Sequence, residues 1–174
     1  RDINDTADDI ATRYPGYTIK KVMWDSYKRE SSATGFSYPE VTRTVKQQQQ
    51  AGALIMDYGG HGSEIQISHE NVLRITAFSS FSNTNLPPWI TAARDILPFD
   101  DNTSTIGEEA VLNAKGGAVA FYGTTRTVFT GYNKAMNKTY LKHVLSTVDG
   151  KAVTIGEAQR LAKNPEDADD VLDL

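Results

Sequence analysis

The sequence predicts an α/β protein with a mostly parallel sheet. Short apolar segments alternate with helical segments, and glycines or prolines separate them. Strands are expected over 18–25, 53–58, 89–95 and 118–122. Strands that alternate with helices and are joined by short connections form a parallel, doubly wound sheet. Because a helix opens the chain with no strand before it, we expect this sheet to be incomplete at the N-terminus.

The helical segments are predicted from apolar spacing and from the residues at their ends. We expect helices over 5–14, 40–51, 106–115 and 133–148. The pair Gly116-Gly117 is predicted to cap the third of them. The last helix carries an apolar stripe at helical spacing. Residues 165–174 are acidic and are predicted to fray.

Composition sets limits on the class of protein. A chain of 174 residues corresponds to one domain, 1–174, or to part of one. A net charge of -4 argues against a nucleic-acid surface. No apolar run approaches the roughly 20 residues that span a bilayer. The chain contains no cysteine, which excludes disulfides, thiolate metal sites and a cysteine nucleophile within it. Because it starts with a polar segment and without Met, we expect it to come from a larger protein.

The end of the predicted strand 53–58 carries the clearest candidate for chemistry. Gly60 and Gly62 flank His61 there. Ligands of parallel sheets gather at the carboxyl ends of strands, and flanking glycines let a substrate backbone approach closely. The segment therefore predicts a catalytic imidazole. The alternative interpretation is a turn whose histidine satisfies only local hydrogen bonds.

Arg94 marks a second strand end expected beside His61. Neighbouring parallel strands bring their carboxyl ends to the same edge of a sheet, so the ends of 53–58 and 89–95 should be adjacent. A nucleophile would be expected at this second end. Arg94 is always protonated and cannot attack a carbonyl. Structurally, Arg94 could instead pair with one of the nearby acids, Asp95, Asp100 or Asp101.

Glu64 and His69 lie close to His61 in the sequence. Glu64 orients a pocket or meets a basic substrate residue; the alternative is a solvated loop acid. Ser68 is predicted to cap the N-terminus of a helix that has His69 in its first turn, so we do not expect His69 to act as a second base.

Three ordered blocks of the sequence carry a resemblance to a known family. The blocks are Tyr58-Gly59-Gly60-His61-Gly62-Ser63-Glu64, Leu86-Pro87-Pro88-Trp89-Ile90-Thr91-Ala92 with Asp95 and Phe99-Asp100-Asp101, and Ile106 through Arg126 with Lys115-Gly116-Gly117. They resemble the gingipain-type cysteine peptidases, most closely the branch that contains the type IX secretion sortase PorU. Together with similar upstream stretches they cover roughly residues 10–145, in the family's order.

This resemblance implies a caspase-like, three-layer α/β fold and a peptidase site. It makes His61 the general base and places the family's catalytic cysteine at Arg94, or at Ala93 if the alignment shifts by one. The family's pocket tryptophan falls at Ile67. The implied substrate pocket and oxyanion site consist of Gly60, Gly62, Ser63, Glu64 and Ile67. The acid that orients the imidazole would lie near the chain start, at Asp2, Asp5 or Asp8.

The resemblance also implies a biological setting. It predicts a secreted, cell-surface or outer-membrane protein of a Gram-negative bacterium, with protein or peptide substrates and further domains of the same parent protein as partners. No cofactor and no metal is expected for the chemistry. Neither nucleic acid nor a membrane span in this chain is expected.

Three hypotheses about function follow. The first is a gingipain-type peptidase or sortase domain, inactive in this chain because Arg94 replaces the nucleophile. The second is a noncatalytic relative that binds an extended peptide or C-terminal signal, with Arg94 offering a cation to a carboxylate. The third is a different α/β protein in which Asp95, Asp100 and Asp101 bind a divalent cation.

Overall fold

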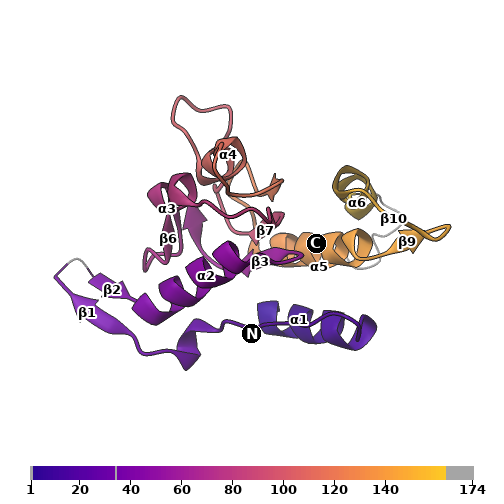
Figure 1. Cartoon of the computed structure of the whole chain (residues 1–174), viewed down its shortest axis with the longest axis horizontal. Coiled ribbons are helices and arrows are strands. Elements are labelled where there is room, and N and C mark those ends of the chain that lie inside the picture. Colours follow the sequence, from indigo (N-terminus) through magenta and orange to yellow (C-terminus); the bar gives the residue numbers. More distant parts are fainter. Residues whose placement is uncertain (1, 34, 164–174) are drawn as a thin grey trace. The chain divides into compact units, whose positions relative to one another are not determined.

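The structure is a computed structural model that describes residues 2–33 and 35–163. These residues form two compact units (Figure 1). Unit 1 contains the chain up to residue 21 and from residue 128 on, and unit 2 contains residues 22–127. Each unit is described by itself. The predicted fraying of 165–174 falls outside the described residues, and the prediction of a single domain stays a prediction.

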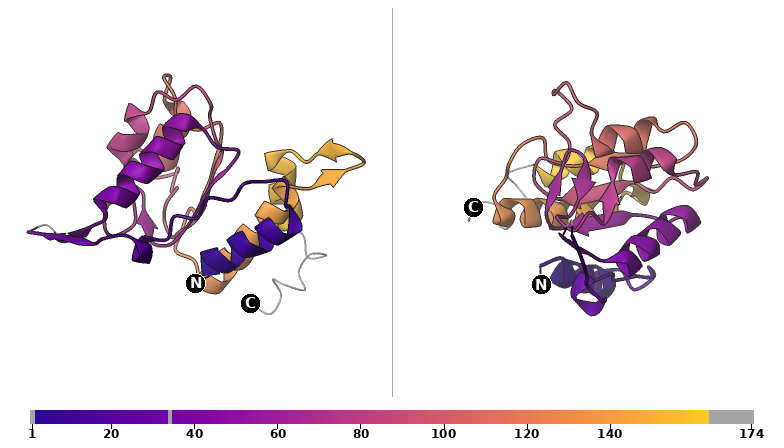
Figure 2. Two further views of the ribbon diagram at one scale, coloured as in Figure 1. Left: turned by 60° about the horizontal axis from the view of Figure 1, so that its bottom comes forward. Right: turned by 90° about the vertical axis from the view of Figure 1, so that its left-hand side faces the viewer.

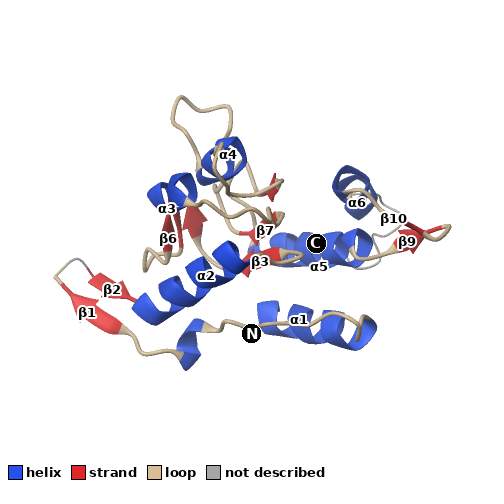
Figure 3. Ribbon diagram, in the orientation of Figure 1, coloured by secondary structure: helices blue, strands red, loops and turns tan. Residues whose placement is uncertain are grey.

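A parallel sheet lies at the centre of unit 2. Its strands are β3 (Met56–Gly59), β7 (Trp89–Ala92) and β8 (Phe121–Tyr122), in the order β3-β7-β8. Met56 pairs with Trp89, and Trp89 pairs with Phe121. The sequence prediction of neighbouring parallel strands is confirmed. The strands are shorter than predicted: β3 and β8 begin three residues later than expected, and β7 ends three residues earlier, where the chain continues as a loop (Figure 3).

The helices of unit 2 are α2 (Pro39–Ala51), α3 (Ile75–Ser80) and α4 (Ile106–Leu112). Pro39 begins α2, where a missing N–H costs no helical hydrogen bond. A capping box between Thr105 and Glu108 begins α4. This helix ends at Leu112 with Asn113 as its C-cap, so the predicted cap at Gly116-Gly117 is wrong.

Gly117 has a tertiary role instead of a capping role. Its φ is 94°, and a Cβ there would collide with the Ala110 carbonyl oxygen. The Gly117 N–H donates to Asn83 Oδ1 at 2.8 Å, and the Gly117 carbonyl accepts from Gln49 Nε2 at 2.6 Å. The glycine is therefore needed for a close backbone approach.

A small antiparallel sheet follows β3 and was not predicted. It consists of β4 (Gly62–Ser63), β5 (Gln66–Ile67) and β6 (Leu73–Arg74). His69 lies in the turn between β5 and β6, and the next helix begins only at Ile75. The predicted helix with Ser68 as its cap is therefore wrong: Ser68 has a φ of 71° and belongs to this turn.

The predicted strand over 18–25 is also wrong. Residues 18–23 pair with no described strand, and Trp24–Ser26 form a short 3₁₀ turn, η1. The Trp24 ring stacks on Tyr58 at a centroid distance of 5.7 Å. Side-chain packing thus replaces the expected sheet pairing. A hairpin of β1 (Glu30–Ser32) and β2 (Gly35–Ser37) follows.

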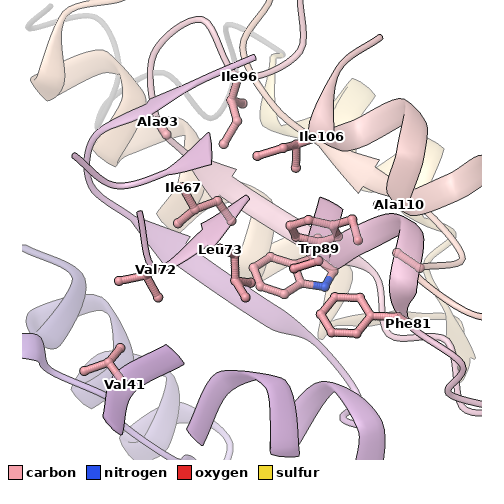
Figure 4. Packing of buried hydrophobic residues seen from close by; sticks show 13 residues of the cluster. Val41, Ile67, Val72, Leu73, Phe81, Trp89, Ala93, Ile96, Ile106 and Ala110 are labelled. Atoms are coloured by element: carbon pink, nitrogen blue, oxygen red, sulfur yellow. The ribbon is translucent and has the colours of Figure 1, made fainter. Parts of the chain in front are cut away.

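Aromatic and aliphatic side chains from the parallel sheet, from the β4-β5-β6 sheet and from the helices fill the core of unit 2 (Figure 4). Phe78 packs edge-on against Trp89 at 5.2 Å. The indole N–H of Trp89 donates to Gln49 Oε1 at 2.9 Å, so this buried polar pair is satisfied. Ala93 and Ile96, which follow β7, are fully buried in the same cluster.

Unit 1 consists of α1 (Asp2–Arg13), α5 (Thr130–Val144), α6 (Ile155–Ala162) and a hairpin of β9 (Thr147–Val148) and β10 (Lys151–Ala152). Helix α1 packs alongside α5 (Figure 2). Tyr14 Oη donates to the Lys142 carbonyl at 3.1 Å, and Tyr140 Oη donates to the Ile155 carbonyl at 3.1 Å. The helix predicted over 133–148 ends at Val144, because the chain then enters the hairpin.

None of the described helices is long and apolar enough to span a bilayer.

Candidate functional site

The carboxyl ends of β3 and β7 lie next to each other. Gly59 is paired with Ala92, and Gly60 N donates to the Ala92 carbonyl at 3.2 Å, one step beyond the ladder. His61 follows Gly60 directly, and Arg94 comes two residues after Ala92. The prediction that both residues follow adjacent parallel strands at one sheet edge is therefore confirmed.

Two hydrogen bonds to one carbonyl hold the backbone at His61. Tyr58 Oη donates to the His61 carbonyl at 2.7 Å, and Ser68 N donates to it at 2.8 Å. Burial, and secondarily the charge of Glu70, raises the pKa of the Tyr58 phenol well above its usual value. The phenol is therefore neutral throughout the physiological pH range and remains a donor.

A second imidazole lies beside the first. The rings of His61 and His69 are 4.6 Å apart between centroids, with an angle of 35° between their planes, and both residues are exposed. The sequence analysis missed this pairing because it placed His69 on a helix. The available signal was weak, since the strands that form the intervening hairpin are only two residues long.

The backbone that carries Arg94 is tied to the loop after β8. Thr124 Oγ1 donates to the Ala93 carbonyl at 2.5 Å, and Leu97 N donates to the Thr124 carbonyl at 3.0 Å. The Arg94 residue is exposed. Its side chain makes no hydrogen bond or ion pair within residues 2–33 and 35–163. A fixed backbone thus presents a cation that has no partner among the described residues.

The acids near Arg94 have other partners. Asp100 forms a two-pronged ion pair with Arg126, at 3.0 and 2.6 Å, which lowers the pKa of the Asp100 carboxyl. Asp95 Oδ2 accepts from Thr127 Oγ1 at 2.7 Å. The interpretation of Arg94 as the ion-pair partner of these acids is therefore wrong. In the described ranges, no group of three or more His, Asp or Glu residues is arranged to hold a metal ion.

Gly62 connects the two strand ends by direct packing. A Cβ at Gly62 would lie 3.1 Å from Ala93 Cβ and 3.1 Å from Ile96 Cδ1, closer than side chains normally approach. The loop that carries His61 is therefore seated on the residue that precedes Arg94. Only a glycine permits this distance without displacement of the buried neighbours.

The remaining pocket candidates have varied surroundings. Ile67 is 2% exposed and belongs to the core, so burial explains an apolar residue there. Glu64 is half-buried, and its carbonyl accepts from Ile106 N at 2.7 Å, which ties the hairpin to the start of α4. Ser63 Oγ accepts weakly from Ile65 N at 3.4 Å. A Cβ at Gly60 would lie 2.5 Å from Tyr58 Oη.

The candidate orienting acids lie in unit 1, on α1. Asp8 is ion-paired with Lys21 at 2.5 Å. The assignment of an acid to His61 from Asp2, Asp5 or Asp8 therefore stays a prediction.

Comparison with known proteins identifies the class to which this fold and strand-end histidine belong. The model of peptidase family C25 matches residues 2–170, and the chain belongs to this family, the gingipain family. No curated protein matches the chain.

Two solved structures share the fold. The chain is similar to the complex of Porphyromonas gingivalis RgpB pro- and mature domains, with a TM-score of 0.69 at 18% identity over 97% of this chain. It is also similar to the Arg-specific cysteine proteinase gingipain R, with a TM-score of 0.64 at 18% identity over 97% of this chain. The chain spans only 40% and 39% of these two. Unit 2 has the parallel sheet and covering helices of the caspase-like α/β fold of these neighbours.

Proposed function

We propose that this chain is a gingipain-family peptidase domain in which Arg94 occupies the position of the catalytic cysteine, so that it cannot cleave peptides by itself. The observation that carries the proposal is the adjacency of the strand ends that bear His61 and Arg94. In a cysteine peptidase these two positions belong to the base and the nucleophile. A guanidinium cannot form an acyl intermediate, because it is protonated at all accessible pH values.

The backbone of the site supports this assignment. Ala93 is fully buried and its carbonyl is bonded, so position 94 occupies a defined place whatever its side chain. The His61 carbonyl accepts two hydrogen bonds, so the imidazole also starts from a fixed backbone. Without the nucleophile, only acceleration by binding and by oxyanion stabilisation is left, roughly 10³–10⁴-fold over water.

The proposed substrates are extended segments of secreted proteins, received at this sheet edge. The sequence blocks resemble the sortase branch of the family, and on that basis we place the parent protein at the surface of a Gram-negative bacterium in type IX secretion. Further domains of the parent protein complete the enzyme or its partner surface. No cofactor is required for this chemistry.

The test restores the thiol. The variant Arg94→Cys should react with iodoacetamide at pH 6 faster than Asp101→Cys, which places a thiol on the same exposed loop, because an adjacent imidazole increases the thiolate fraction. Adding His61→Ala to Arg94→Cys should remove the difference. Equal labelling of both thiols would contradict the assignment of position 94.

The wild-type chain should not hydrolyse fluorogenic peptides. Turnover that disappears in His61→Ala would show that the chain is active without a cysteine and would refute the proposed inactivity. A lack of hydrolysis would also result if the chain did not bind these peptides. The thiol-labelling experiment on Arg94→Cys therefore tests the position of the nucleophile.

The second candidate is a noncatalytic peptide- or signal-binding relative. It is favoured by the exposed Arg94 side chain, which has no partner within the described ranges. Such a cation can bind a terminal carboxylate with two hydrogen bonds. A peptide with a free C-terminus should then bind at least tenfold more tightly than its amidated form, and Arg94→Ala should abolish the difference.

A further inference from the structure

The pair of imidazoles at His61 and His69 contains one residue that the proposed peptidase chemistry does not use. We propose that the two side chains together bind a divalent transition-metal ion, with Zn²⁺ as the representative. The ion would thus coordinate the imidazole of His61, the proposed catalytic base. Its binding goes beyond the proposed function, and residue 94 is not one of the proposed ligands.

The backbone places His69 directly after Ser68, the residue that lies opposite His61. Gly62 pairs with Ile67 across the β4–β5 hairpin, and Ser68 N donates to the His61 carbonyl at 2.8 Å. Ser68 adopts a φ of 71°, and its Oγ accepts from Glu70 N at 3.0 Å. This bonded turn places His69 beside the hairpin end that carries His61.

The ring separation suits a shared ion. Zinc binds imidazole nitrogen at about 2.0–2.1 Å in tetrahedral geometry, which places two such rings about 5 Å apart between centroids. The rings of His61 and His69 are 4.6 Å apart. The observed centroid separation is thus within about half an ångström of the bound value. Because both residues are exposed, rotation of the two side chains can direct one nitrogen of each ring to a shared ion without disturbing the core.

The chemistry of the donors selects the class of ion. Neutral imidazole suits Zn²⁺, Ni²⁺ and Cu²⁺, whereas Ca²⁺ and Mg²⁺ require oxygen ligands. Two imidazoles supply half of a tetrahedral set, and water completes it. The described residues hold no group of three or more His, Asp or Glu ligands, so we expect a weak, exchangeable site with open positions.

The carboxylate of Glu70 adds favourable charge close by. Its Oε2 accepts a short hydrogen bond from Ser68 Oγ, in the same turn as His69. The charge of Glu70 also contributes to the raised pKa of the Tyr58 phenol, whose hydroxyl donates to the His61 carbonyl. A cation between the imidazoles therefore lies near an acid that is fixed by the same turn.

The test uses the tag-free chain and ZnCl₂. Isothermal titration should give saturable 1:1 binding, and His61→Gln and His69→Gln should each weaken it at least tenfold. The control is His143→Gln, which changes the third histidine of the chain, on α5, and should leave the affinity unchanged. MgCl₂ should produce no saturable heat.

NMR on the wild-type chain makes the result independent of how the variants fold. Addition of Zn²⁺ should shift the ring resonances of His61 and His69 together, and those of His143 should not follow. Absence of saturable Zn²⁺ binding, equal affinity in His69→Gln, or a shift of only one of the two rings would each overturn the proposal.

Discussion

The ends of β3 and β7 are both fixed, but in different ways. At the β7 end, the loop after β8 holds the backbone through Thr124, and the Arg94 side chain projects without a described partner. At the β3 end, Tyr58 and Ser68 hold the backbone, and the His61 ring has a second imidazole beside it. The backbone frame of the site is thus independent of the residue at position 94. Under the proposed function, the loss of the nucleophile is a change of one side chain, whereas the histidine end is shaped by its tertiary neighbours.

The largest effect is expected where the two ends touch. Gly62→Ala should destabilise the chain by about 1–3 kcal/mol, because the added methyl overpacks against the buried Ala93 and Ile96. Urea denaturation measures the change in the free energy of unfolding. The control is Gly16→Ala, where a Cβ meets nothing within 4 Å. Equal stability of the Gly62→Ala and Gly16→Ala variants would show that the two ends do not pack as described.

A smaller loss is expected from the bond that holds the β7 end. Thr124→Val keeps the shape of the side chain but leaves the Ala93 carbonyl without its donor, at a cost of about 1–2 kcal/mol. Thr125→Val is the matched control on the next residue. Amide hydrogen exchange in residues 93–97 should accelerate only in the Thr124 variant. If exchange there is unchanged, another contact holds this backbone.

At the β3 end, Tyr58→Phe should cost about 0.5–1.5 kcal/mol through loss of the hydrogen bond to the His61 carbonyl. The raised pKa of Tyr58 favours the neutral folded form, so its contribution to stability is full below the ordinary tyrosine pKa of 10.0 and declines as the pH rises above that value. The stability difference between wild type and variant should therefore shrink above pH 10. Because burial also raises the pKa of Tyr122, the comparison must use the difference between the two chains. A difference that stays constant up to pH 12 would contradict the burial of Tyr58.

The smallest effect is expected at Arg94 itself. Arg94→Cys should change the free energy of unfolding by less than about 0.5 kcal/mol, since an exposed side chain with no described partner contributes little. Thermal denaturation in the presence of a reducing agent measures this. A loss of more than about 1 kcal/mol would mean that Arg94 has a structural role of its own.

Local signals were sufficient for the elements that carry the candidate site. The apolar runs before Gly59 and before Ala93 predicted two parallel strands, and the alternation with helices predicted that they are neighbours. Pro39 correctly marked the start of α2, and the apolar spacing of α4 was sufficient to place its first residue, Ile106. The ordered blocks around His61 led to the family. In each case the deciding residues lie within one element or at its ends.

The sequence by itself determined the α/β class, the adjacency of His61 and Arg94, and the absence of a thiol. Only the tertiary structure decided that the segment 18–25 forms no strand and that His69 belongs to a turn beside His61. It also decided that Gly117 allows a close backbone approach to Ala110 on α4 and that Thr124 holds the backbone before Arg94. The physical reason is that a strand needs a partner and a left-handed turn needs bonds to other segments. Propensity and periodicity describe one segment at a time, whereas these features depend on which distant segments meet.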